Sequence, residues 1–241
     1  MKGESKVTLQ TRPAWAADAF VRAIWVATGE SPEWIAARTN SLIQQLRHLF
    51  DIEHWRTLDD EPWEGSEGEL VRIVRSYVSV NDAYEPPQPE PESGYRIWLS
   101  GEGPRVRIRV EINAGAISPG GRIPLHHLTV RIHEQTPGDI TSEAADAVCA
   151  AVASTWNPAY AKLTDSATNS LARRGGWKIG VGYRTWISSD VGTVSHLGDQ
   201  LSSTELAGGT LISAPDDWPA ARVVEAMTAT LRENGMDEVP H

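Results

Sequence analysis

Alternation of apolar and other side chains along residues 177–189 constrains the fold of this chain more than any other stretch of its sequence. The series occupies every second position: Ile179, Val181, Tyr183, Thr185 and Ile187. A period of two predicts a β-strand with one apolar face. Gly180 and Gly182 fall on the opposite face, where the absence of side chains lets a neighbouring element approach closely. We therefore expect a packed sheet that includes this strand.

The same alternation recurs earlier in the chain. Between Arg105 and Ile112, apolar side chains alternate with arginine and glutamate, which indicates a sheet with one solvent-exposed face. Further strands are predicted over 94–100, 125–133 and 208–213. Residues 19–27 are largely apolar, and periodicity leaves open whether they form a strand or the end of a helix.

Residues 32–50 are predicted to form an amphipathic helix. Ser31 is a suitable cap, Pro32 fits the first turn, and Glu33 complements the positive end of the helix dipole. Further helices are predicted over 70–78, over 140–154, and over a last segment that ends near 233. Hairpin-like strands with helices set apart from them predict an α+β fold, with a mostly antiparallel sheet and segregated helices.

The chain is expected to form a single domain over residues 1–241, with a proline-rich acidic loop at 82–93. A length of 241 residues allows one large domain or two small ones. Four prolines in the loop favour an extended polyproline conformation, which is also typical of linkers. The strands that follow the loop are too few to fold alone, so one domain is favoured.

Charge and composition narrow the functional classes. The formal net charge is −10, from 22 Lys+Arg against 32 Asp+Glu, which argues against a general nucleic-acid binder and suits a basic partner. Acidity that only serves solubility is the alternative. No apolar run approaches the roughly 18 residues that a membrane span needs, and Met1–Gln10 lacks a signal-peptide core. A cytoplasmic protein that contacts neither membrane nor nucleic acid is expected.

The sequence contains no recognised enzyme motif. The loop Gly115–Arg122 lacks the lysine and hydroxyl residue of a phosphate-binding loop. His127 and His133 would lie about 20 Å apart on a strand, so a metal site is not expected. Cys149 lies in an alanine/valine stripe, where a buried thiol is the usual state. We therefore expect no catalytic residues, no metal and no cofactor.

Acidic stretches with interspersed aromatic residues are the strongest candidates for binding. They cover 59–69, 82–92 and the segment between Arg184 and Arg222. Charge steers the encounter with a cationic protein, and aromatic anchors supply binding energy. The alternative is solvated loops whose tryptophans are buried. The residues predicted to contact a partner are Asp59, Asp60, Glu61, Trp63, Glu64, Asp216, Asp217 and Trp218.

From about residue 19 onward, the chain resembles the immunity protein 52 family of bacterial polymorphic toxin systems. Five blocks carry the resemblance, in order: Ile24-Trp25 with Gly29-Glu30-Ser31, the helix from Ala36-Ala37-Arg38 to Phe50, and then Trp55; Asn81-Asp82 with Gly94-Tyr95-Arg96-Ile97-Trp98 and Gly101; Trp156-Asn157-Pro158; Val181-Gly182-Tyr183-Arg184-Thr185-Trp186-Ile187-Ser188; and Gly208-Gly209-Thr210-Leu211-Ile212 with the final helix. The chain departs from the family at Val26-Ala27-Thr28, where a Gly-Pro-Arg turn is usual.

The resemblance implies a non-enzymatic α+β antidote that binds a cognate toxin domain, often a nuclease, inside the producing bacterium. The family has no catalytic residues to carry over, and its contact positions vary with the toxin. Two other classes stay open on the residues alone: a small cytoplasmic enzyme with an unrecognised site, and an adaptor subunit of a secretion system.

Overall fold

A computed structural model describes residues 12–173 and 175–241 and shows an α+β fold. The strands are β1 (Ala19–Ile24), β2 (Trp55–Thr57), β3 (Val80–Asn81), β4 (Gln88–Pro89), β5 (Tyr95–Glu102), β6 (Val106–Ala114), β7 (His127–Glu134), β8 (Tyr160–Thr164), β9 (Arg184–Ser188), β10 (Ser202–Leu206) and β11 (Gly209–Ser213). The α-helices are α1 (Pro32–Phe50), α2 (Glu67–Ser76), α3 (Ser142–Trp156), α4 (Ser166–Leu171) and α5 (Ala220–Glu233).

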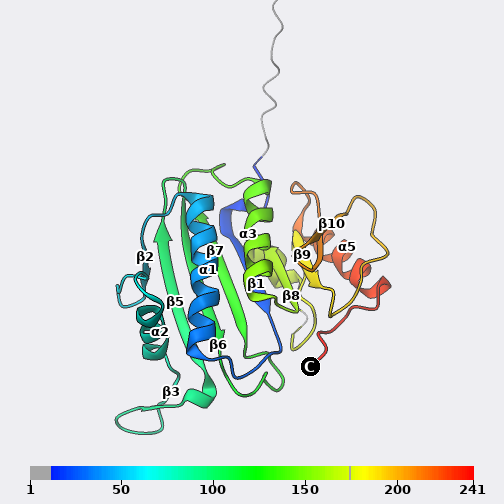
Figure 1. Cartoon of the computed structure of the whole chain (residues 1–241). Helices are drawn as coiled ribbons and strands as arrows, with labels where there is room; N and C mark the ends of the chain where they lie inside the picture. Colours follow the sequence, from blue (N-terminus) through cyan, green and yellow to red (C-terminus); the bar gives the residue numbers. More distant parts are fainter. Residues whose placement is uncertain (1–11, 174) are drawn as a thin grey trace, which may run out of the picture.

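Nine of the strands form one antiparallel sheet in the order β10-β11-β9-β8-β1-β7-β6-β5-β2. The two remaining strands, β3 and β4, pair with each other in a short hairpin. Helices α1 and α3 lie side by side across one face of the sheet, here called the inner face (Figure 1). Apolar side chains of β1, β6 and β7 are fully buried beneath them, among them Val21, Ile108 and Val130.

Among the described residues, helices cover the opposite, outer face only near β8, toward the end of the sheet formed by the later strands. Lys162 points from β8 to this side, where its Nζ donates a hydrogen bond to Asn169 of α4. Helix α5 packs against α4 on the same side. The outer face of β5, β6 and β7 carries no helix among the described residues, and arginines on it stay exposed.

Helix α1 has the predicted bounds because its end signals are satisfied. The Ser31 hydroxyl accepts a hydrogen bond from the Trp34 N–H over 3.2 Å, and Pro32 occupies the first turn. Asp51 ends the helix in the left-handed conformation at φ 53°. Helix α2 begins three residues before the predicted segment, where Ser66 and Glu69 form a capping box.

The strand predicted over 177–189 is wrong in its length and in its single apolar face. Only Arg184–Ser188 is a strand, and every residue from 179 to 188 is buried. The expected close approach at the glycines is confirmed, since a Cβ on Gly182 would lie 2.1 Å from the carbonyl oxygen of Leu163. The irregular chain around Gly180 and Gly182 therefore packs against β8, while residues 177–179 bond to the C-terminal segment. Because side chains on both faces are buried, their alternation does not mark one apolar face.

Other boundaries differ from expectation where local signals are weak. The ambiguous segment 19–27 contains β1, and the proline-rich stretch at 82–93 includes β4 of the short hairpin. Strands β2, β8 and β10 and helix α4 were not predicted. The alternation over β6 is confirmed, with buried and exposed residues in regular succession.

The buried position of Lys162 makes the stability of the fold depend on pH. Burial, followed by the charge of Arg22, lowers the pKa of Lys162 from 10.5 to about 8. Between these values the unfolded chain binds more protons than the folded chain, so stability rises with pH. We expect the free energy of unfolding to increase by about 1–2 kcal/mol from about pH 7.5 to about pH 9.5. The Lys162→Met variant should lose most of this increase in urea titrations; an equal increase in both proteins would contradict the assignment.

Candidate functional site

Trp98 stands at the centre of a groove on the outer face of the sheet. One hollow of about 520 Å³ is lined by Leu58 and Asp60 from the loop after β2 and by Trp98, Arg109 and Arg131 from the strands. Trp98 also lines a second hollow of about 510 Å³. The two hollows share this half-buried indole, so together they form one surface, here called the Trp98 groove.

The second hollow has an acidic wall built from segments distant in sequence. Asp59, Asp82 and Glu90 line it together with Arg96. The Asp59 carboxylate accepts a hydrogen bond from the Tyr77 hydroxyl over 2.8 Å. Pairing of β3 with β4 brings Asp82 and Glu90 to the same place. Two of the three acidic stretches predicted to bind a partner therefore meet in this groove.

The loop after β2 is held in a defined turn that presents its tip to the groove. The Thr57 N–H donates to the Glu61 carbonyl over 2.8 Å, and Asp60 adopts a left-handed φ of 64°. Arg56 pairs with the Asp60 carboxylate over 3.3 Å. This turn leaves Leu58, an apolar side chain, 71% exposed in the hollow that Trp98 also lines.

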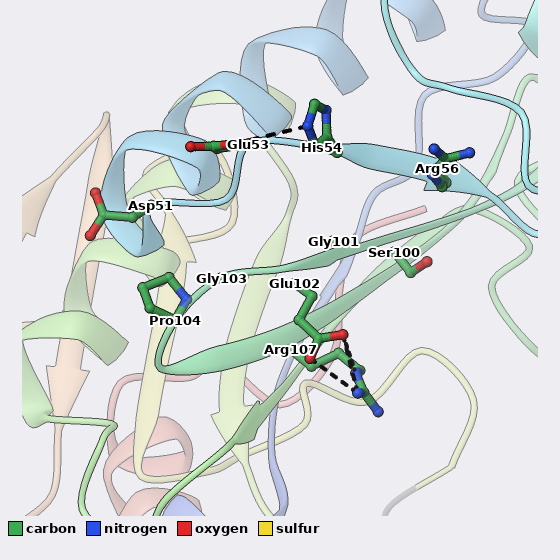
Figure 2. Close-up of a pocket in the computed structure, with 10 residues that line it drawn as sticks. All are labelled: Asp51, Glu53, His54, Arg56, Ser100, Gly101, Glu102, Gly103, Pro104 and Arg107. Carbon is green, nitrogen blue, oxygen red and sulfur yellow. Dashed lines mark hydrogen bonds and ion pairs between the residues drawn. The ribbon is translucent and has the colours of Figure 1, made fainter.

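A polar hollow of about 680 Å³ adjoins the groove at Ser100, which lines both (Figure 2). Figure 2 shows two close pairs among its side chains: Arg107 reaches Glu102 over 3.1 Å, and His54 lies 3.9 Å from Glu53, while Asp51 and Arg56 lie apart from both pairs. All four side chains are at least half exposed, and such surface pairs contribute about 0–1 kcal/mol. The hollow extends the groove along the β2 edge and does not bring these groups together around a single reacting position.

The structure separates the first set of predicted contact residues. Asp59, Asp60 and Glu64 are exposed, and Asp59 and Asp60 line the Trp98 groove. Glu61 forms an ion pair with Arg72. Trp63 is only 2% exposed, so its indole belongs to the core and is not presented as an anchor.

The second set lies at the other end of the sheet, and two of its three members are structural. The Asp216 carboxylate accepts hydrogen bonds from Arg184 Nη1 over 2.8 Å, from Trp15 Nε1 over 2.7 Å, and from the Ser142 hydroxyl. Burial alone would raise the pKa of Asp216, but the hydrogen bonds from Arg184 and Ser142 outweigh it and lower the pKa. Trp218 is 6% exposed. Only Asp217 is exposed, so this set does not form a joint contact surface.

His126 and His127 have local partners, and the cysteine is buried. His126 is buried against the Ala27 carbonyl, and His127 contacts Asn113 over 3.0 Å. Across 12–173 and 175–241, no three His, Cys, Asp or Glu side chains are grouped as metal ligands. Cys149 is buried, as predicted, and burial raises its pKa to about 12. A thiol in this state is unreactive at neutral pH.

Sequence reasoning missed Trp98 and the arginines around it as site residues. The alternation of arginine with apolar residues did predict a solvent-exposed face. Strand register then decides which polar residues become neighbours: Trp98 lies opposite Glu111, and Arg109 lies opposite Arg131. That register is not readable from one strand alone.

Comparisons with known proteins show a similar fold in a solved structure but no relative by sequence. No protein-family model matches the chain, and no curated protein matches it in sequence. A solved structure of a Pseudomonas aeruginosa T6SS protein is similar, with a TM-score of 0.50 and 7% sequence identity over 90% of this chain and 72% of that one. At this identity the likeness shows a shared fold. None of the described helices is long and apolar enough to cross a membrane.

Proposed function

We propose that this protein is an immunity protein that binds and neutralises a cognate toxin domain through the Trp98 groove. The convergence of two acidic stretches beside a half-buried tryptophan carries the proposal. Aromatic anchors near the centre of an interface supply most of its binding energy, and a charged rim steers association. A nuclease is the toxin class that fits the acidic wall, because nuclease clefts are basic.

Two further observations are compatible with this function, and the second fits the adaptor alternative as well. The ordered blocks from Ile24 to the last helix resemble immunity protein 52 sequences. The similar solved structure belongs to a protein named as a T6SS protein of Pseudomonas aeruginosa. No catalytic chemistry enters the proposal, since occupation of the toxin's cleft is sufficient for inhibition.

The proposal is tested with the C-terminal domain encoded by the gene adjacent to this chain's gene. The two purified proteins are mixed, and complex stoichiometry and residual nuclease activity are measured on the same sample. A 1:1 complex without activity is the expected result. An active toxin domain and no complex at micromolar concentration would refute the proposal and favour the enzyme or adaptor alternatives.

Charge reversal on the acidic wall should slow the formation of this complex. Asp60 and Asp82 are exposed at the groove, and their carboxylates attract a basic cleft over several ångströms. For Asp60→Lys with Asp82→Lys, we expect association about tenfold slower, with a weaker dependence on salt. Stopped-flow kinetics at two salt concentrations measure both quantities. Reversal at the remote, exposed Asp217 is the control and should leave the rate unchanged.

A further inference from the structure

The outer face of the sheet places arginines next to one another although the chain as a whole is acidic. Arg109 of β6 lies directly opposite Arg131 of β7 in the antiparallel register. Side chains in such positions have Cβ atoms about 4.5–5.5 Å apart, and like charges there destabilise the sheet. Arg131 is stacked over the Phe20 ring at 5.1 Å. The like-charge pair costs stability, and the contact of Arg131 with Phe20 offsets only part of that cost.

Two arginines at the rim of this region have a carboxylate partner, but the groove arginines do not. Arg56 pairs with Asp60 and Arg107 with Glu102. Within 12–173 and 175–241, Arg96 and Arg109 form no ion pair. The positive charge of the arginines also affects His127. Burial lowers the pKa of His127 most, and the charge of Arg22 lowers it further. Arg96 makes a smaller contribution in the same direction, and the charge of Glu111 opposes them.

We propose that Arg96, Arg109 and Arg131 bind carboxylate side chains on the surface of the toxin domain. The inference rests on the proposed function and adds that the toxin's contact surface carries both signs of charge. Its basic groups face Asp59, Asp82 and Glu90, and its carboxylates lie against Arg96 in the same hollow and against Arg109 and Arg131 in the adjoining one. Side-by-side regions of opposite charge fix the orientation of a complex, because a rotated partner would meet like charges.

A protein surface fits this groove better than a nucleic acid does. The hollow that contains Arg109 and Arg131 also contains Asp60, and the hollow that contains Arg96 also contains Asp59, Asp82 and Glu90. A phosphate backbone is negative along its whole length, so the carboxylates in both hollows would repel it. A protein can place opposite charges at the required positions.

The test compares the wild-type protein with the Arg96→Glu, Arg109→Glu double variant in the toxin complex. We expect the dissociation constant to rise about 100-fold, because carboxylates then face carboxylates across the interface. Arg122→Glu with Arg232→Glu is the matched control: it makes the same change in net charge at exposed positions outside the groove hollows. The control should bind within about threefold of the wild type.

Thermal unfolding separates a lost contact from a damaged fold. Arg109→Glu converts the like-charge pair with Arg131 into an opposite-charge pair, so this single variant should be at least as stable as the wild type while binding more weakly. A wild-type complex that the groove variants leave unchanged would overturn the inference and keep the proposed function. Absence of any wild-type complex would overturn both. Binding of a duplex DNA oligonucleotide that the groove variants abolish would assign the arginines to nucleic acid instead.

Discussion

Replacing Asp216 with alanine is expected to lower the free energy of unfolding by about 3 kcal/mol or more. The side chain of Arg184 is 5% exposed and would lose its bidentate partner, keeping Asp146 at 2.6 Å and the carbonyl oxygens of Tyr183 and Ala214. Trp15, which is fully buried, would lose the acceptor of its indole N–H. A buried guanidinium that loses one of its two carboxylates, together with a buried indole N–H left without an acceptor, costs more than a missing surface contact. Calorimetry should show a fall in Tm of roughly 6–12 °C.

The neighbouring residue is a control for this prediction. Asp217 is exposed, and its replacement with alanine should change stability by no more than about 0.5 kcal/mol. The two acidic residues look equivalent in the sequence, and the structure assigns them different roles. Similar stability of both variants would contradict the role of Asp216 as the partner of Arg184.

The Gly182→Ala variant is expected to lose about 1–3 kcal/mol or more of stability. The new Cβ would lie 2.1 Å from the Leu163 carbonyl oxygen, which belongs to the backbone of β8 and cannot rotate away. Either the chain around Gly182 moves off the sheet or β8 shifts, and both lose buried contacts. Urea unfolding measures the loss.

The same substitution at a second glycine is expected to raise stability instead of lowering it. Gly68 lies in the first turn of α2 with no atom within 4 Å of an added Cβ. Gly68→Ala should therefore raise stability by about 0.5–1 kcal/mol, because alanine loses less backbone entropy on folding. If Gly182→Ala were as stable as Gly68→Ala, close packing of the chain around Gly182 on β8 would be excluded.

Much of the fold was predictable where local signals agree with burial. Helix α1 has a cap, a proline in its first turn and an apolar stripe, and its bounds match the prediction. The alternation over β6 holds because one face is under helices and the other is open. It failed over 177–189 because both faces are buried there. Strand β10, with almost entirely exposed residues, has no apolar face that a pattern could reveal.

Charge predicted part of the candidate site. The acidic stretches around Asp59 and Asp82 do meet in one groove, although nothing in the sequence places them together. Asp216 was misassigned because its partner, Arg184, stands at the far boundary of an otherwise acidic segment and reaches it only through the fold. The arginines beside Trp98 escaped notice because each strand shows one or two of them, and strand register makes them neighbours.

The affinity of the Trp98→Ala variant for the toxin domain tests the central claim most directly. Trp34→Ala is the matched control, since Trp34 is also half-buried but lies on α1, on the inner side of the sheet. If the Trp98 groove is the binding surface, Trp98→Ala should weaken binding by about 30-fold or more in titration calorimetry, while Trp34→Ala binds like the wild type. Equal affinities of Trp98→Ala and the wild type would show that the toxin binds elsewhere.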